Sequence, residues 1–247
     1  MIYYFDELDS TNIKIKELAI GGAEHGTVVV ADKQTAGKGR RGRTWESPAG
    51  ANLYFSILLR PSFATEKAPM LTLVMAYSAA KVIREQLHME AMIKWPNDLV
   101  LSKKKICGIL TEMSLKGMDI DYIVVGTGIN VNLTTFPEEL KETATSLFLE
   151  KGVQVDRDAL LDAVLQEFWK QYEIFAEIQD LSYLQKEYNE ILVNCGKEVC
   201  VLEPRNEYKA IAQGINETGE LLVTKADGSE SVVYAGEVSV RGIYGYV

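Results

Sequence analysis

The spacing of apolar residues changes near residue 195, and this change constrains the fold of the chain more than any other feature. Before it, strand-like runs such as TVVVADK (27–33) and ANLYFSILLRP (51–61) alternate with longer segments of helical spacing. From residue 196 onward, only short alternating runs separated by turn residues remain. The pattern predicts an α/β (α+β) domain over residues 1–195, followed by a small β-barrel domain over residues 196–247.

Two long helices are predicted in the first domain. Leu71 and Val74 belong to an apolar stripe in residues 68–87, which indicates a helix packed against a sheet. A second long helix is expected to begin near Asp156 and to extend through Phe175. The other predicted elements are a strand at IYYFDEL, short helices over 13–19 and 181–192, and a meander of AMIKW to NDLVL, KICGILTEM and DYIVVGTGINVNL.

The composition limits the class of function. Apolar residues make up 47% of the chain and charged residues 25%, as in an ordinary globular protein. The net charge of -9 argues against generic nucleic-acid binding, because such affinity comes from basic groups that neutralise phosphates. With three cysteines that form no CxxC pair and two histidines, no structural metal is expected. No leader and no apolar stretch of about 18 residues is seen, so a cytoplasmic protein without a membrane partner is expected.

A glycine-rich basic segment, AGKGRRGR (36–43), stands out in this acidic chain. Four basic side chains occupy the six positions 38–43, and the glycines between them let the backbone approach a ligand closely. Guanidinium groups and free backbone amides together suit a carboxylate or a phosphate. The segment therefore predicts an anion-binding loop, with a solvated basic turn as the alternative.

Three other interpretations of glycine-rich segments fit less well. Gly37-x4-Gly42-Arg43-Thr44 resembles a phosphate-binding P-loop, but a strand follows it where a P-loop requires a helix. The triplet GTG (126–128) lacks the third glycine of a dinucleotide fingerprint and continues as a strand. Binding of single-stranded nucleic acid is disfavoured, because the basic cluster is isolated in a negatively charged chain.

Four segments taken together resemble the biotin-protein ligase family: STN (10–12), QTAGKGRRGRTW (34–45), KWPND (94–98) and KICGIL (105–110). GTGIN (126–130) and GEVSVR (236–241) extend this resemblance over nearly the whole chain. The resemblance implies a mixed-sheet catalytic domain of the biotin/lipoate ligase type, with helices on one side, followed by an SH3-like barrel. It also implies the short form of the family, without an N-terminal DNA-binding repressor domain and without DNA as a partner.

The resemblance implies an ATP-dependent reaction in two steps. The carboxylate of biotin attacks the α-phosphate of ATP, with Mg²⁺ bridging the phosphates, and biotinyl-5'-AMP and pyrophosphate form. A lysine of a biotin carboxyl carrier protein, part of a biotin-dependent carboxylase, then takes the biotinyl group. A homodimer is left open, as are two alternative functions: a lipoate-type acyl-protein ligase and a non-catalytic regulator that binds biotin or a nucleotide.

The resemblance also assigns binding residues one by one. The biotin contacts are Ser10, Thr11, Asn12, Gln34, Lys38, Gly39, Arg40, Lys105 and Gly108. The ATP contacts are Arg40, Arg43, Trp45, Lys94, Asn97, Lys105 and Asn130. Residues 10–12 could alternatively cap a helix. At position 38 lysine replaces the usual arginine, which keeps the charge but loses the bidentate fork.

Three residues are assigned to catalysis. Lys105 would stabilise the charge that develops as pyrophosphate leaves, together with Arg40. Asp98 would accept a hydrogen bond or a proton from the incoming lysine. Glu237 and Arg241 share one strand face, and they would either tie the barrel to the active site or pair with each other.

Overall fold

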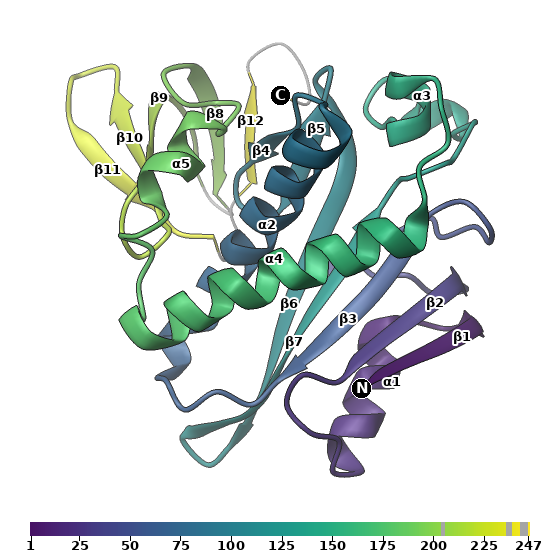
Figure 1. Ribbon diagram of the computed structural model, residues 1–247. Helices are drawn as coiled ribbons and strands as arrows, with labels where there is room; N and C mark the ends of the chain where they lie inside the picture. The colour runs from purple at the N-terminus through teal and green to yellow at the C-terminus, as the bar shows by residue number, and fades with distance from the viewer. Residues whose placement is uncertain (204–205, 236–238, 243–246) are drawn as a thin grey trace.

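The computed structural model describes the chain except for residues 204–205, 236–238 and 243–246. A seven-stranded sheet dominates its first part, in the order β1-β2-β3-β7-β6-β5-β4 (Figure 1). The pair β1 and β2 is parallel and all the other neighbours are antiparallel, so the sheet is mixed, and β4 to β7 form the predicted meander. The strands are β1 (Ile2–Leu8), β2 (Val28–Gln34), β3 (Leu53–Leu59), β4 (Met92–Lys94), β5 (Asp98–Leu101), β6 (Lys104–Lys116) and β7 (Asp119–Ile129).

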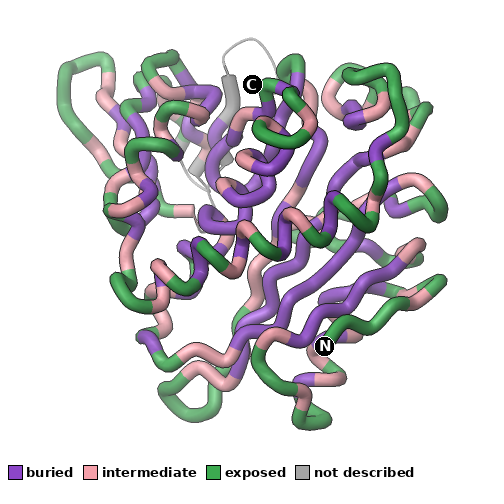
Figure 2. The backbone as a smooth tube through the Cα atoms, viewed as in Figure 1, coloured by how far each residue is buried: buried purple, intermediate pink, exposed green. Residues whose placement is uncertain are grey.

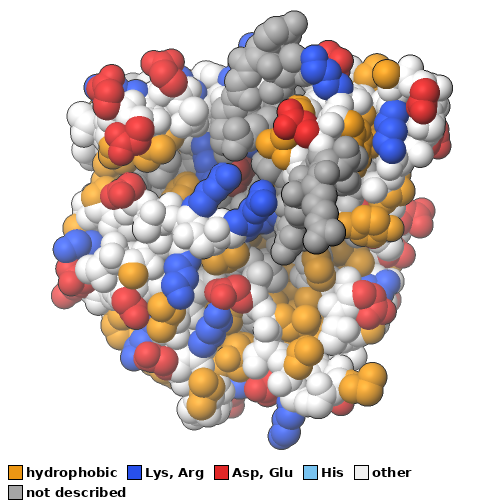
Figure 3. All heavy atoms as spheres, turned by 180° about the vertical axis from the view of Figure 1, so that it is seen from behind, with side chains coloured by type: hydrophobic (Ala, Val, Ile, Leu, Met, Phe, Trp, Pro, Cys, Tyr) orange, Lys and Arg blue, Asp and Glu red, His pale blue; other side chains and the backbone are white. Residues whose placement is uncertain are grey.

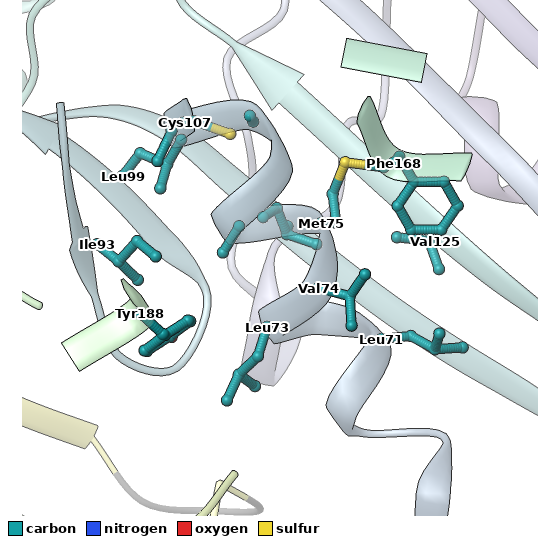
Figure 4. Close-up of a cluster of buried hydrophobic side chains, with 14 of the residues drawn as sticks. Leu71, Leu73, Val74, Met75, Ile93, Leu99, Cys107, Val125, Phe168 and Tyr188 are labelled. Carbon is teal, nitrogen blue, oxygen red and sulfur yellow. The ribbon is translucent and has the colours of Figure 1, made fainter. Parts of the chain in front are cut away.

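The two predicted long helices cover one face of this sheet. Helix α2 (Met70–Leu87) lies against the strands, and α4 (Arg157–Ile178) packs on α2. The Asp156 side chain accepts hydrogen bonds from the first turn of α4 as its N-cap, so the helix begins where it was predicted to begin. Figure 4 shows Leu71 and Met75 of α2 in the same apolar cluster as Phe168 of α4 and Val125 of β7.

Helix α1 (Thr11–Ile20) lies on the opposite face of the sheet, so the prediction that the helices lie on one side is wrong. Ile15 of α1 packs with Leu58 of β3 and Val124 of β7, in a cluster separate from the main core. The physical reason is that β3 is buried at every position, as the buried centre of the sheet in Figure 2 shows. A strand that is apolar on both faces needs cover on both.

Shorter elements connect the main ones. The helix predicted over 181–192 is confined to α5 (Gln185–Glu190), because the chain then leaves the helical path to join β4. The amide of Ile93 donates to the carbonyl of Ile191, and the amide of Val193 donates to the carbonyl of Ile93. The remaining short elements are α3 (Leu147–Lys151) and the single 3₁₀ turns η1 (Arg40–Gly42), η2 (Thr65–Lys67) and η3 (Glu138–Leu140).

A second, five-stranded sheet follows residue 195. It is antiparallel throughout, in the order β11-β10-β9-β8-β12, as expected for a small all-β unit. The indole nitrogen of Trp95 donates to the carbonyl of Gly219 at 2.9 Å and links the two sheets. The strands of this second sheet are β8 (Glu198–Glu203), β9 (Asn206–Ile215), β10 (Leu221–Lys225), β11 (Glu230–Val233) and β12 (Ser239–Gly242). Within the described part of the chain, no helix has the length and apolar character needed to cross a membrane.

Candidate active site

Two adjoining cavities bring the predicted site residues together. The larger has a volume of about 560 Å³ and lies between the basic loop, the turn 95–97 and the segment 133–144. The smaller, of about 50 Å³, lies between the start of α1 and strands β6 and β7. Every residue assigned above to biotin, ATP or catalysis lines at least one of the two cavities. Glu237 is outside the described residues, and Arg241 belongs to β12.

Glycines of β6 and β7 form the floor of the smaller cavity, and we call Gly108, Gly126 and Gly128 the glycine floor. Gly108 and Gly128 are directly paired across the two strands. A methyl group added at Gly126 would lie 1.9 Å from Asn12 Oδ1, and one at Gly128 would lie 2.7 Å from Trp45 Nε1. The triplet at 126–128 is thus part of a strand, and its glycines leave bare backbone where other residues would fill the cavity.

The start of α1 supplies a buried polar wall to the smaller cavity. Ser10, Thr11 and Asn12 are each at most 5% exposed. Ser10 holds the N-cap position, but its side chain makes no capping hydrogen bond, so helix capping does not account for it. Gln34 at the end of β2 accepts a hydrogen bond from the amide of Thr11 at 2.8 Å and donates one to Ser47 at 3.0 Å.

A charged group stands behind this wall. Asn12 Nδ2 donates to Glu112 Oε2 at 2.7 Å, and Ser56 Oγ lies 2.6 Å from Asn12 Oδ1. The Lys16 ammonium lies 2.6 Å from the other oxygen of Glu112. Burial raises the pKa of Glu112, but the hydrogen bonds from Lys16 and Asn12 outweigh it and lower the pKa below the ordinary range. The carboxylate is therefore ionised at neutral pH.

The basic loop closes on itself between the two cavities. The Trp45 amide donates to the carbonyl of Gly37 at 2.9 Å, and the Gly39 amide donates to the carbonyl of Arg43 at 2.7 Å. A side chain at Gly37 would collide with the Trp45 carbonyl, at 2.4 Å, so the closed loop requires glycine there. Arg41 and Gly42 turn the chain with φ of 60° and 71°.

Arg40 ties this loop to both sheets. Its guanidinium donates to Asn97 Oδ1 at 2.9 Å and to the carbonyl of Ala235. Burial lowers the pKa of Arg40, Asp98 opposes that shift, and the charges of Arg41 and Arg43 add to it. An anion bound here would compensate for this crowding of positive charge. Figure 3 shows lysine and arginine side chains gathered across the middle of the face turned away from α4.

Lys105 lies where the two cavities meet. Its ammonium lies 2.7 Å from Asp98 Oδ1 and 4.8 Å from the centre of the Trp45 ring. Its backbone is held by the segment 143–145 through hydrogen bonds at 2.8 and 2.9 Å. Trp45 lies against the glycine floor, and its buried Nε1 has no hydrogen-bond partner among the described residues. The assignment of Trp45 to ATP stays a prediction.

The other residues assigned to ATP lie around the larger cavity. Lys94 and Asn130 are nearly buried, with exposures of 6% and 4%, and Arg43 is exposed at the rim. Asn97 donates to the carbonyl of Ile109, and Asn130 donates to the carbonyl of Thr145, both at 3.1 Å. These bonds hold the two amide side chains in fixed orientations.

Several site residues were not predicted from the sequence. Ser56 could have been noticed, because it is a polar residue in the apolar run LYFSILL, whereas Glu112 stands in the mixed run LTEMSLK and carries no such signal. Gly126 was noticed in a weak nucleotide-binding triplet and in the family segment GTGIN, but it was assigned no contact. The segment that closes the larger cavity through Leu133, Phe136 and Pro137 carries no recognisable signal.

The site can bind two ligands side by side and join them. A buried polar pocket suits a neutral head group, an adjoining larger cavity with cationic walls suits a polyanion, and a lysine and an arginine lie at their junction. The mixed sheet with this pair of cavities defines a two-substrate ligase domain.

Comparison with known proteins supports this class. The biotin/lipoate A/B protein ligase family matches residues 4–130, and the biotin protein ligase C terminal domain matches residues 195–241. The chain belongs to the biotin protein ligase family. It is 35% identical to the bifunctional ligase/repressor BirA of Bacillus subtilis over 95% of this chain and 72% of that protein. It is 30% identical to the biotin–[acetyl-CoA-carboxylase] ligase of Paracoccus denitrificans, over 95% of this chain and 98% of that protein. The structure of biotin protein ligase from Aquifex aeolicus in complex with biotin and ATP superposes with a TM-score of 0.86, at 33% identity and 98% coverage of both chains.

Proposed function

We propose that the chain activates biotin with ATP to biotinyl-5'-AMP and then transfers the biotinyl group to a lysine of a carrier protein. The single observation that carries the proposal is the junction of the two cavities at Arg40 and Lys105. A carboxylate reaching out of the smaller cavity would meet there a phosphate held in the larger one. The similarity to a relative whose structure is a complex with biotin and ATP supports the binding of these two ligands.

The polar wall favours biotin over lipoate as the acid. The ureido ring of biotin carries hydrogen-bond donors and an acceptor, whereas the dithiolane ring of lipoate carries no strong ones. Thr11, Asn12 and Gln34 are polar and line the smaller cavity. A site built to hydrogen-bond a substrate rejects an analogue that lacks those groups, because its own buried groups would stay unpaired.

In the first step, the residues at the junction would bind and stabilise anionic groups. The Lys105 ammonium and the Arg40 guanidinium would face the α-phosphate and stabilise the charge that develops as pyrophosphate leaves. Mg²⁺ would arrive with the phosphates of ATP. The carboxylates of Glu46 and Asp98 line the larger cavity, and the described residues hold no cluster of three metal-binding side chains. These two carboxylates would suit a metal ion whose other ligands are phosphate oxygens. We also propose that the chain divides into two units between residues 195 and 196, and that the second unit contacts the site through the Ala235 carbonyl, which accepts a hydrogen bond from Arg40.

The decisive test of the function is pyrophosphate release on mixing the protein with ATP, Mg²⁺ and an acid. Biotin should give rapid release and lipoate none. Release with lipoate instead would favour the lipoate-type ligase, and no release with either acid would favour a non-catalytic binding protein. A carrier domain added after biotin should become biotinylated, and failure of that step alone would contradict only the transfer half of the proposal.

Asp98→Asn is expected to slow the transfer step more than the activation step. The Asp98 carboxylate lies in the larger cavity and is ion-paired with Lys105 at 2.7 Å. As a general base, it would accept the proton of the acceptor lysine, and such groups typically contribute about 10²–10⁴-fold in rate. Single-turnover transfer from preformed biotinyl-5'-AMP should therefore fall by about 10²-fold or more, with a smaller change in pyrophosphate release. Equal slowing of both steps would remove Asp98 from this role.

A further inference from the structure

Glu112 is a charged residue that touches the polar wall from behind. It lies on β6, and its side chain contacts Asn12 and Lys16 of α1 rather than lining the smaller cavity. The distances are 2.7 Å to Asn12 Nδ2 and 2.6 Å to Lys16 Nζ. Among the described residues that line that cavity, Asn12 is hydrogen-bonded to Glu112, whereas Lys38 acts on it through charge alone. We therefore expect Glu112 to affect a ligand there through Asn12.

An ionised carboxylate can only accept hydrogen bonds, and this fixes the direction of the bonds beside it. Asn12 must turn its Nδ2 group toward Glu112, so its Oδ1 faces Ser56 at 2.6 Å. Oδ1 can only accept, so the Ser56 hydroxyl spends its one hydrogen there. Thr11 Oγ1 lies 2.8 Å from the same hydroxyl oxygen and 3.2 Å from Gln34 Oε1, so its one hydrogen is donated to one of these two oxygens.

The chain of bonds determines what the wall can offer to a ligand. Thr11 donates its hydroxyl hydrogen within the protein, to Ser56 or to Gln34, so the capacity left on Oγ1 is that of an acceptor. Asn12 Nδ2 is used by Glu112 and by the Leu110 carbonyl at 3.4 Å, so its remaining capacity is on Oδ1, also an acceptor. Both residues line the smaller cavity. Reversing the Asn12 amide would reverse this pattern.

We propose that Glu112 is a positioning residue that locks the amide of Asn12, so that the smaller cavity presents acceptors to the N–H groups of a cyclic urea. This inference rests on the proposed function, because the ureido ring of biotin is the cyclic urea in question. Lys16 holds the second oxygen of Glu112 and keeps the carboxylate in place. Gly126 keeps open the space that the Asn12 side chain occupies.

Glu112→Gln tests the inference, because it removes the charge while keeping the shape. Asn12 and Lys16 both donate hydrogen bonds to Glu112, but a glutamine has only one acceptor oxygen, so its NH₂ group would face one of these two donors. The glutamine would therefore no longer fix the orientation of the Asn12 amide. The loss of a hydrogen bond to a charged group typically weakens ligand binding by roughly tenfold to hundredfold. Biotin affinity measured calorimetrically without ATP should fall by about that factor, and the KM for biotin should rise equally. The KM for ATP and the kcat at saturating biotin should stay unchanged.

Two further variants separate positioning from general damage. Glu7→Gln removes a carboxylate that is paired with Lys33 at 2.7 Å on the exposed edge strand, and it should leave biotin binding unchanged. Asn12→Ala provides the second comparison: in that background Glu112→Gln should weaken biotin binding no further, because the residue through which it acts is gone.

The outcomes distinguish this inference from the proposed function. Unchanged biotin affinity in Glu112→Gln, or an equal loss with and without Asn12, would overturn the inference while leaving the function intact. A wild-type protein without affinity for biotin would overturn both. If Glu112→Gln does not fold, Lys16→Met takes its place: it should weaken biotin binding only when Asn12 is present, and a loss independent of Asn12 would contradict the proposal.

Discussion

Lys105→Ala is expected to reduce the rate of pyrophosphate release by about 10²–10³-fold, the usual loss when one group that stabilises developing charge is removed. The ammonium lines both cavities and is directed by Asp98 at 2.7 Å. It lies over the Trp45 ring, so it is partly shielded from water, and this increases its effect on a nearby phosphate. Stopped-flow detection of pyrophosphate at saturating ATP and biotin measures the change.

Lys103 provides the matched control for Lys105. It lies two residues earlier and is exposed, and its side chain lines neither cavity. Lys103→Ala should release pyrophosphate at the wild-type rate, which separates the position of Lys105 from the basic character of the segment. A normal rate of pyrophosphate release for Lys105→Ala, in a protein whose melting curve is unchanged, would show that Lys105 is not a catalytic residue.

Arg40→Ala should raise the KM for ATP and also lower kcat, with a combined loss in kcat/KM of about 10²–10³-fold. Arg40 would lose its proposed contact with the phosphates, and the loop would lose its bonds to Asn97 and to the carbonyl of Ala235. Arg40→Lys should recover only part of the activity, because an ammonium keeps the charge but cannot reach two partners in the planar geometry of a guanidinium. Steady-state kinetics with ATP as the varied substrate gives both constants.

Arg84 controls for the loss of an arginine elsewhere. It pairs with Glu90 at 2.7 Å and donates to the carbonyl of Ala91 at 3.1 Å, at the end of α2 away from both cavities. Arg84→Ala should leave the kinetics unchanged.

Full recovery by Arg40→Lys would mean that charge alone matters at position 40, and the bridge between the two sheets would then have no part in the reaction.

Most of the first domain could be predicted because its elements are specified locally. The stripe of α2 and the cap at Asp156 each lie within a few residues of the structure they determine. The length of α5 could not, because it depends on hydrogen bonds to Ile93, which is about one hundred residues earlier in the sequence. The packing of a helix on the second face of the sheet could have been predicted. The strand LYFSILL shows no alternation of apolar and polar residues, and such a strand must be covered by other elements on both of its faces.

The residues of the site likewise fall into those marked by their local sequence and those that depend on distant parts of the chain. That Arg40 and Lys105 line the cavities could be predicted, because their chemistry is unusual in their local sequence and because the motifs around them resemble a family. Glu112 and Gly126 could not, because their roles depend on pairing between distant strands. Gly126 lies opposite Ser56 on one side and Leu110 on the other, and only this register places all of them around Asn12.

The glycine floor limits how the substrate range of this chain can change by mutation. Gly108, Gly126 and Gly128 have no side chain, so every substitution at these positions adds atoms above the sheet. No single exchange there can enlarge the smaller cavity. Variation at these three positions can therefore only exclude acids that the present pocket admits, and a descendant that accepts a bulkier acid would have to arise through changes in the walls.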